Sequence, residues 1–186
     1  MVKPEIKSGT VLLAEPFMLD PNFRRTALLL VEHNEEGSVG FVLNRPTNMQ
    51  MGELIQDFPE IEAKVFYGGP VQPDTVHYLH RMGDLLEDSF EVVPGVFWGG
   101  DFDKLKFLIE QQLITPRDIR FFLGYSGWTA GQLKAELEEY GSWVTARMDV
   151  NYLFKSNPNN LWTQVMENKG KLYEVIADMP DDATFN

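Results

Sequence analysis

The feature that most constrains how this chain can fold is an apolar or β-rich run over residues 25–33. A turn and a second run of the same kind follow it. Between Thr26 and Val31 the apolar residues show no polar alternation, which indicates a strand covered on both faces. Residues 34–37 (Asn-Glu-Glu-Gly) are polar and end in a glycine suited to positive φ, as in a tight turn. Residues 38–44 then return as a strand. We therefore predict an antiparallel hairpin at this point.

Strand-like segments dominate the first half of the chain, and helical spacing enters in the second. Further strands are predicted over residues 10–14, 64–67, 75–80, 90–93, 96–98, 119–123 and 142–148. Helices are predicted over residues 51–58, after Asp101, over 129–140 with Thr129 as the cap, and over 160–168. This order predicts an α+β fold, with a mixed, largely antiparallel sheet and helices packed against it.

Composition limits the class of function. The chain has 186 residues, which fits one domain over residues 1–186, and we expect its ends, about 1–8 and 178–186, to fray. Its net charge of −12 repels phosphate backbones, so direct nucleic-acid binding is not expected. The absence of cysteine excludes disulfides and thiolate metal sites. No apolar run approaches a membrane span or a signal peptide, so we expect a cytoplasmic protein with no membrane contact.

Several short motifs follow one another in a fixed order. They are Leu13-Ala14-Glu15-Pro16 with Asp20-Pro21-Asn22-Phe23, Val31-Glu32-His33, Gly40-Phe41-Val42-Leu43-Asn44-Arg45-Pro46, Gly68-Gly69-Pro70-Val71, and Leu123-Gly124-Tyr125-Ser126-Gly127-Trp128 with Gly131-Gln132-Leu133 and Glu136. Over about residues 9–162 this series resembles the YqgE/AlgH family of bacterial proteins. The resemblance implies a sheet curled partly into a barrel with helices outside, a cytosolic location, and a role in transcriptional regulation.

The segment Gly124 to Trp128 is predicted as a strand-to-helix turn. Hydrolases place a nucleophilic serine in such a turn, but their Gly-x-Ser-x-Gly spacing is absent, so Ser126 is not predicted to be catalytic. Backbone amides at a helix start, approached by glycines, favour an anion, and a purely structural turn is the alternative. We predict no cofactor, because no phosphate-binding fingerprint is present. Tyr125, Ser126 and Trp128 are candidate ligand-binding residues.

A second group of candidates lies at the loop ends beside the predicted hairpin. Arg24 and Arg45 could converge on a carboxylate or phosphate through paired hydrogen bonds, with Asn44 between them. In the alternative, which the excess of acidic residues favours, Asn44 and Arg45 hydrogen-bond loop carbonyls and Arg24 pairs with a carboxylate. Arg24, Asn44 and Arg45 therefore complete the predicted ligand site.

Three other features have structural interpretations. His77 and His80 are three apart on a strand and point to opposite faces, so no metal site is predicted. Gly68 and Gly69 indicate a strand exit that needs positive φ or the close approach of another segment. The carboxylates from Glu136 to Glu139 are predicted to form a solvated helix face without acid–base chemistry.

Three functional hypotheses remain. The first is a non-enzymatic regulator that acts through a protein or small-molecule partner. The second is a small-ligand binder or enzyme, with a pocket near Arg24, Asn44, Arg45 and the segment from Tyr125 to Trp128. The third is an interaction module that self-associates as a homo-oligomer through exposed aromatic side chains or an open strand edge.

Overall fold

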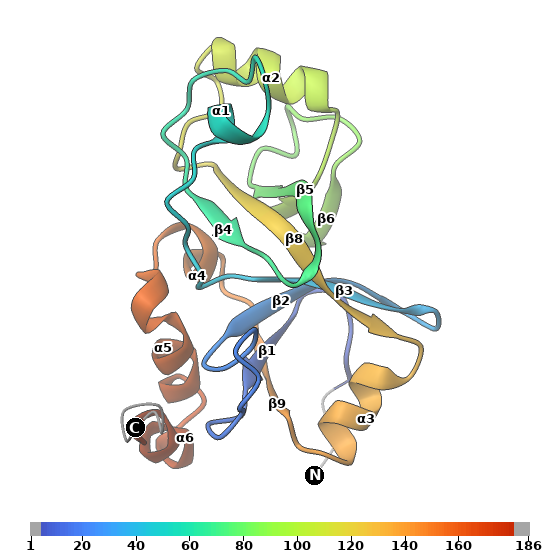
Figure 1. Cartoon of the computed structure of the whole chain (residues 1–186), viewed down its shortest axis with the longest axis vertical. Helices are drawn as coiled ribbons and strands as arrows, with labels where there is room; N and C mark the ends of the chain where they lie inside the picture. Colours follow the sequence, from blue (N-terminus) through green and yellow to red (C-terminus); the bar gives the residue numbers. More distant parts are fainter. Residues whose placement is uncertain (1–4, 181–186) are drawn as a thin grey trace.

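The computed structural model describes residues 5–180, and nine strands in this part of the chain form one curled sheet, a half-barrel with helices around it (Figure 1). The strand order is β6-β7-β5-β8-β3-β2-β1-β9, and β4 pairs with β8 in parallel. The strands are β1 (Thr10–Ala14), β2 (Ala27–Asn34), β3 (Gly37–Val42), β4 (Val65–Tyr67), β5 (Val71–His80), β6 (Phe90–Val93), β7 (Val96–Trp98), β8 (Ile119–Thr129) and β9 (Trp143–Arg147). The predicted α+β fold is confirmed.

Short helices surround the sheet. They are α1 (Met51–Leu54), α2 (Phe102–Glu110), α3 (Gln132–Glu138), α4 (Val150–Phe154), α5 (Leu161–Glu167) and α6 (Lys171–Ala177), with a 3₁₀ turn, η1, at Pro158–Asn160. In Figure 1, α1 and α2 lie at one end of the molecule, whereas α4, α5 and α6 line one side and α3 lies across from them. α4 and α6 were not predicted from the sequence, and α1 is shorter than the helix predicted over residues 51–58.

The predicted hairpin is confirmed as β2 and β3, joined by a turn at residues 35–36. The apolar residues of β2, from Ala27 to Val31, are fully buried. Leu29 packs with the cluster beneath α5 and α6, and its neighbour Leu28 packs with the cluster beneath α3. β2 is therefore covered on both faces, which explains why its sequence shows no alternation.

β8 connects the two halves of the sheet. Its first half pairs with β4 and β5, and residues from Ser126 to Thr129 pair with β3. Gly124, at φ 65°, lies where the pairing passes from one half of the sheet to the other. The predicted strand-to-helix turn at residues 124–128 is therefore wrong. Backbone groups here find partners in β3, and this long-range pairing is invisible to a local glycine pattern.

Helix starts follow capping chemistry only in part. Either Asp101 or Asp103 was predicted to cap α2, and the cap is Asp101, whose carboxylate accepts from the Lys104 N–H at 2.6 Å. α3 begins after Gly131, at φ 77°, so the prediction of Thr129 as its cap is wrong. Thr129 is the last residue of β8, and its N–H donates to Oε1 of Gln132 at 3.0 Å.

Residues 68–69 and 124–125 pass very close to each other where β4 leaves the sheet beside β8. We call this close approach the glycine crossing. A Cβ on Gly68 would lie 2.4 Å from the carbonyl oxygen of Gly124, and a Cβ on Gly69 would lie 2.2 Å from that of Tyr125. Both distances are too short for any side chain. The predicted close approach at Gly68 and Gly69 is confirmed, and it fixes the position of Tyr125.

Two expectations concern the ends of the chain and the membrane. Of the segments expected to fray, residues 1–4 and 181–186 lie outside the described residues. Among residues 5–180, no helix combines the length and apolar character that crossing a bilayer requires.

Candidate functional site

A pocket of about 440 Å³ opens on one face of the sheet where β2, β3 and β8 run side by side. Strand register places Glu32, Val39 and Gly127 in one row across the three strands. Asn34 and Thr129 lie in the next row on the same face. Because Gly127 carries no side chain, backbone atoms form the floor of this pocket at its centre. We call it the β3–β8 pocket.

Carboxylates and one aromatic ring supply the chemistry of this pocket. Glu32 and Glu36 are exposed at the hairpin end, and Asn34 joins them: its Nδ2 donates to Oε1 of Glu32 at 3.0 Å, and its Oδ1 accepts from the Glu36 N–H at 2.8 Å. Tyr125 and Val71 form the opposite wall. None of the residues that line the pocket is a cation. Carboxylates beside an aromatic face suit a positively charged group.

Tyr125 is supported from behind by His77. The two rings meet edge to face at 5.8 Å, and His77 also contacts Phe41 and Trp98. The Thr75 hydroxyl donates to the Gln72 carbonyl, so it accepts a hydrogen bond from Nε2–H of His77 at 3.3 Å. Burial lowers the pKa of His77 below its ordinary value of 6.5. The ring is therefore a neutral packing group and supports Tyr125.

Ser126 and Trp128 point to the other face of β8. Ser126 is fully buried, and its hydroxyl donates to the Gly68 carbonyl at 3.1 Å. It has no access to a substrate. Trp128 contributes to the wall of the β3–β8 pocket, but its indole N–H donates away from it, to Oε2 of Glu136 at 2.9 Å. Of the three residues predicted here, Tyr125 and Trp128 line the pocket and Ser126 does not.

The prediction of a solvated helix face from Glu136 to Glu139 is wrong for Glu136. It is half-buried rather than part of a solvated face, and its Oε2 also accepts from the Trp143 indole N–H at 2.8 Å. Its other oxygen, Oε1, accepts from Nε2 of Gln132 at 2.9 Å. The helical spacing alone predicted an exposed carboxylate, because it does not show that the flanking strands β8 and β9 fold back and place both indoles against α3.

Arg24, Asn44 and Arg45 lie together but outside the residues that line the β3–β8 pocket. Asn44 joins two backbone segments: its Oδ1 accepts from the Ala27 N–H at 3.0 Å, and its Nδ2 donates to the Arg25 carbonyl at 2.9 Å. Arg45 donates to the Arg24 carbonyl. These contacts match the structural alternative, in which Asn44 and Arg45 hold loop carbonyls.

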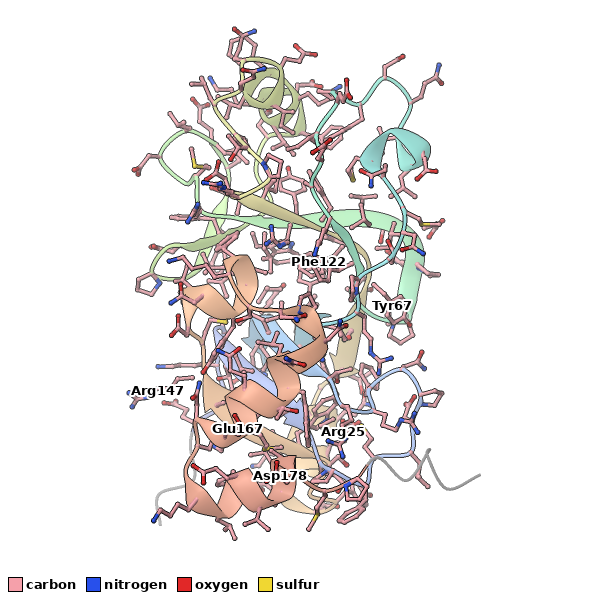
Figure 2. All side chains as sticks on the ribbon, turned by 90° about the vertical axis from the view of Figure 1, so that its left-hand side faces the viewer. Arg25, Tyr67, Phe122, Arg147, Glu167 and Asp178 are labelled. Carbon is pink, nitrogen blue, oxygen red and sulfur yellow. The ribbon has the colours of Figure 1, made fainter. Side chains whose placement is uncertain are left out.

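A tyrosine that the sequence analysis did not single out extends this polar group. The Tyr67 hydroxyl donates to Oδ1 of Asn22 at 3.1 Å, and the Tyr67 N–H donates to the Arg45 carbonyl at 2.8 Å. Burial, and then Asp20, raise the pKa of Tyr67, and Arg45 opposes them. Figure 2 labels Tyr67 on the strands and Arg25 beside the C-terminal helices. The only local sequence signal was the position of Tyr67 just before Gly68-Gly69.

Both histidines of β5 are accounted for within the fold. His80 is fully buried: its Nε2 donates to the Gly99 carbonyl at 2.7 Å, and its Nδ1 accepts from the Met82 N–H at 3.2 Å. Its ring stacks on Phe97, whereas His77 contacts Phe41 on the other face of the strand. Within residues 5–180, no three histidine or acidic side chains come together as metal ligands.

The fold and the β3–β8 pocket define an α+β half-barrel protein with a pocket on one face of its sheet. The model of the AlgH-like family matches residues 11–174. A UPF0301 protein from Chlorobium limicola is 47% identical over 177 residues, 95% of this chain and 94% of that protein. One from Chlorobaculum tepidum is 48% identical over 176 residues, with the same coverage. The chain therefore belongs to the YqgE/AlgH family, also called UPF0301.

Solved structures agree with this assignment. The solution structure of the AlgH protein from Pseudomonas aeruginosa has a TM-score of 0.75 and 31% identity, and the match covers 97% of each chain. A crystal structure of protein DIP2367 from Corynebacterium diphtheriae has a TM-score of 0.79 at 21% identity, and the match covers 96% of this chain and 95% of that one. The second likeness shows the fold alone.

Proposed function

We propose that this protein is a non-enzymatic, cytoplasmic binding protein that takes a small organic cation in the β3–β8 pocket. One observation carries the proposal: the carboxylates of Glu32 and Glu36 and the ring of Tyr125 surround a floor left open by Gly127. A ligand with an ammonium group and an apolar body matches this arrangement. The ammonium faces the carboxylates, and the body packs on Tyr125 and Val71.

A regulatory role, in this proposal, is exerted through the bound ligand and not through DNA. A net charge of −12 opposes approach to a phosphate backbone, and the charged side chains of the pocket are carboxylates. A duplex would meet repulsion at the very surface that is open to a ligand. We accordingly expect any effect on transcription to require a further partner.

The proposal is tested by titrating the protein with 2-phenylethylamine and following backbone amides by NMR. We expect the amides of Gly37 and Gly127 to shift, and 2-phenylethanol, which has the same ring without the charge, to bind at least about tenfold more weakly. The double variant Glu32→Gln/Glu36→Gln should lose most of the affinity. Its control, Glu110→Gln/Glu174→Gln, removes the same charge from exposed helical sites and should bind like the wild type.

Two results would contradict the proposal. Equal binding of the amine and the alcohol would show that the carboxylates do not select the ligand. Equal binding by the two double variants would show that only the overall charge matters. The claim about DNA is tested separately by fluorescence anisotropy with a labelled duplex at low and near-physiological salt. Tight binding that weakens steeply with salt would overturn it.

A further inference from the structure

A second pocket, of about 460 Å³, lies along β9, which is the last strand at one end of the strand order. β9 pairs with β1 on one side only, so its other edge forms the floor of a groove. Leu137 of α3 and Ile6 line the groove on the side of Trp143. Tyr173 of α6 lines it on the side of Val144. We call this the β9 groove.

Lys169 brings a positive charge into the β9 groove. Its Nζ donates to the Thr145 carbonyl and lies 5.0 Å from the centre of the Tyr173 ring. No carboxylate among residues 5–180 forms an ion pair with this ammonium. Burial lowers the pKa of Lys169 below its ordinary value of 10.5. Partly desolvated ammonium groups normally have an anionic partner, which is notable here because acidic residues outnumber basic ones by 28 to 16.

A second hydrogen-bond donor, the backbone N–H of Thr145, faces the β9 groove. In an antiparallel strand the N–H and C=O of one residue face the same side. Because Lys169 reaches the Thr145 carbonyl from the groove, the Thr145 N–H also faces the groove and away from β1. The ammonium and this amide together form a pair of donors at the floor, between walls formed by Trp143, Leu137 and Tyr173.

We propose that the β9 groove binds a small monocarboxylic acid with an apolar chain. The carboxylate accepts from Lys169 Nζ and the Thr145 N–H, and the chain lies on Trp143 and Leu137. The volume of the groove suits a ligand of this size. The site is separate from the β3–β8 pocket and selects the opposite charge.

Hexanoate is the probe for this proposal, titrated into the full-length protein and followed by amide NMR and tryptophan fluorescence. Shifts are expected at Thr145 and Lys169, with a change in the emission of Trp143. Lys169→Met keeps the length of the side chain and removes the charge, and it should weaken binding at least about tenfold. Lys169→Arg keeps the positive charge and should retain most of the affinity. Lys171→Met, at an exposed site in the same segment, should leave binding unchanged.

The amide spectrum of Lys169→Met shows whether that variant is folded, and Lys169→Arg supplies a second test that keeps the positive charge. Unchanged affinity in a folded Lys169→Met protein would overturn the proposal. So would equally tight binding of 1-hexanol, because the groove would then act only through its apolar walls. A dimer in sedimentation that protects the Thr145 amide without any acid would also overturn it, since a second copy would then occupy the edge of β9.

Discussion

Trp128 and Trp143 donate their indole N–H groups to the same atom, Oε2 of Glu136, at 2.9 and 2.8 Å. Their rings meet edge to face at 6.0 Å, and Phe23 packs against both. One carboxylate on α3 thus joins β8 to β9, which are not neighbours in the sheet. Trp128 also borders the β3–β8 pocket and Trp143 borders the β9 groove, so this network lies between the two pockets.

Removing this carboxylate should destabilise the protein. Glu136→Ala leaves two largely buried indole N–H groups without their acceptor, and we expect the free energy of unfolding to fall by about 2–4 kcal/mol. Urea denaturation followed by tryptophan fluorescence measures the change. Glu139→Ala, exposed at the end of the same helix, is the control and should change stability by less than about 0.5 kcal/mol. Equal losses in both variants would show that the two indole hydrogen bonds are not what makes Glu136 stabilising, because alanine itself favours the helix.

The glycine crossing should tolerate no side chain. Gly68→Ala would place a methyl group 2.4 Å from the Gly124 carbonyl oxygen, and backbone atoms cannot move aside cheaply. We expect a loss of about 1–3 kcal/mol or failure to fold. Gly52→Ala, in α1 with open space around it, should be neutral or stabilising by up to about 1 kcal/mol. Thermal denaturation of the pair checks this, and a stable Gly68→Ala protein would refute the crossing.

Asn44 should matter for stability more than for ligand binding. Asn44→Ala removes both its bond from the Ala27 N–H and its bond to the Arg25 carbonyl, and we expect a loss of about 1–3 kcal/mol. The exposed Asn48→Ala is the matched control. Chemical denaturation gives the difference between them. A full-stability Asn44→Ala protein that fails to bind a ligand would instead support the ligand-site interpretation of this residue.

The histidines of β5 predict how stability depends on pH. Burial lowers the pKa of both His77 and His80 below 6.5, and for His80 the hydrogen bond to Gly99 opposes this only partly. Between the lowered pKa and about 6.5 the unfolded chain binds more protons than the folded one, so the free energy of unfolding rises with pH. Stability should therefore be fully present above about pH 6.5 and fall as the solution becomes more acidic.

Urea denaturation at a series of pH values from about 7.5 down to 5.5 measures this dependence, in a range above the ordinary pKa of carboxyl groups. His80→Gln and His77→Gln should each flatten it. His33→Gln is the control, because it removes a histidine near the hairpin turn and leaves both buried rings in place. A slope that both β5 variants leave unchanged would assign the pH dependence to other groups.

Local patterns predicted most of the elements but not their partners. The hairpin at residues 25–44 was predicted because apolar runs and turn residues are local properties of the sequence. The start of α2 near Asp101 was predicted for the same reason, since a capping residue is also a local signal. Residues 124–128 were misread as a turn because their glycines are read locally, whereas their backbone bonds go to β3. α4 and α6 were not predicted, and their length is not the reason, because α5 is as long as α6 and was predicted.

For the candidate site, the difference between what the sequence predicted and what the tertiary structure showed is larger. Short motifs in a fixed order predicted the family and the α+β fold, and two of the candidate residues, Tyr125 and Trp128, line the β3–β8 pocket. The tertiary structure placed Ser126, Asn44 and Arg45 outside that pocket and gave Lys169 and Glu136 their surroundings. Which face a strand residue takes, and which charge or indole a side chain meets, depends on strand register and on packing between elements, even where the partners are close in sequence, as Glu136 is to both indoles.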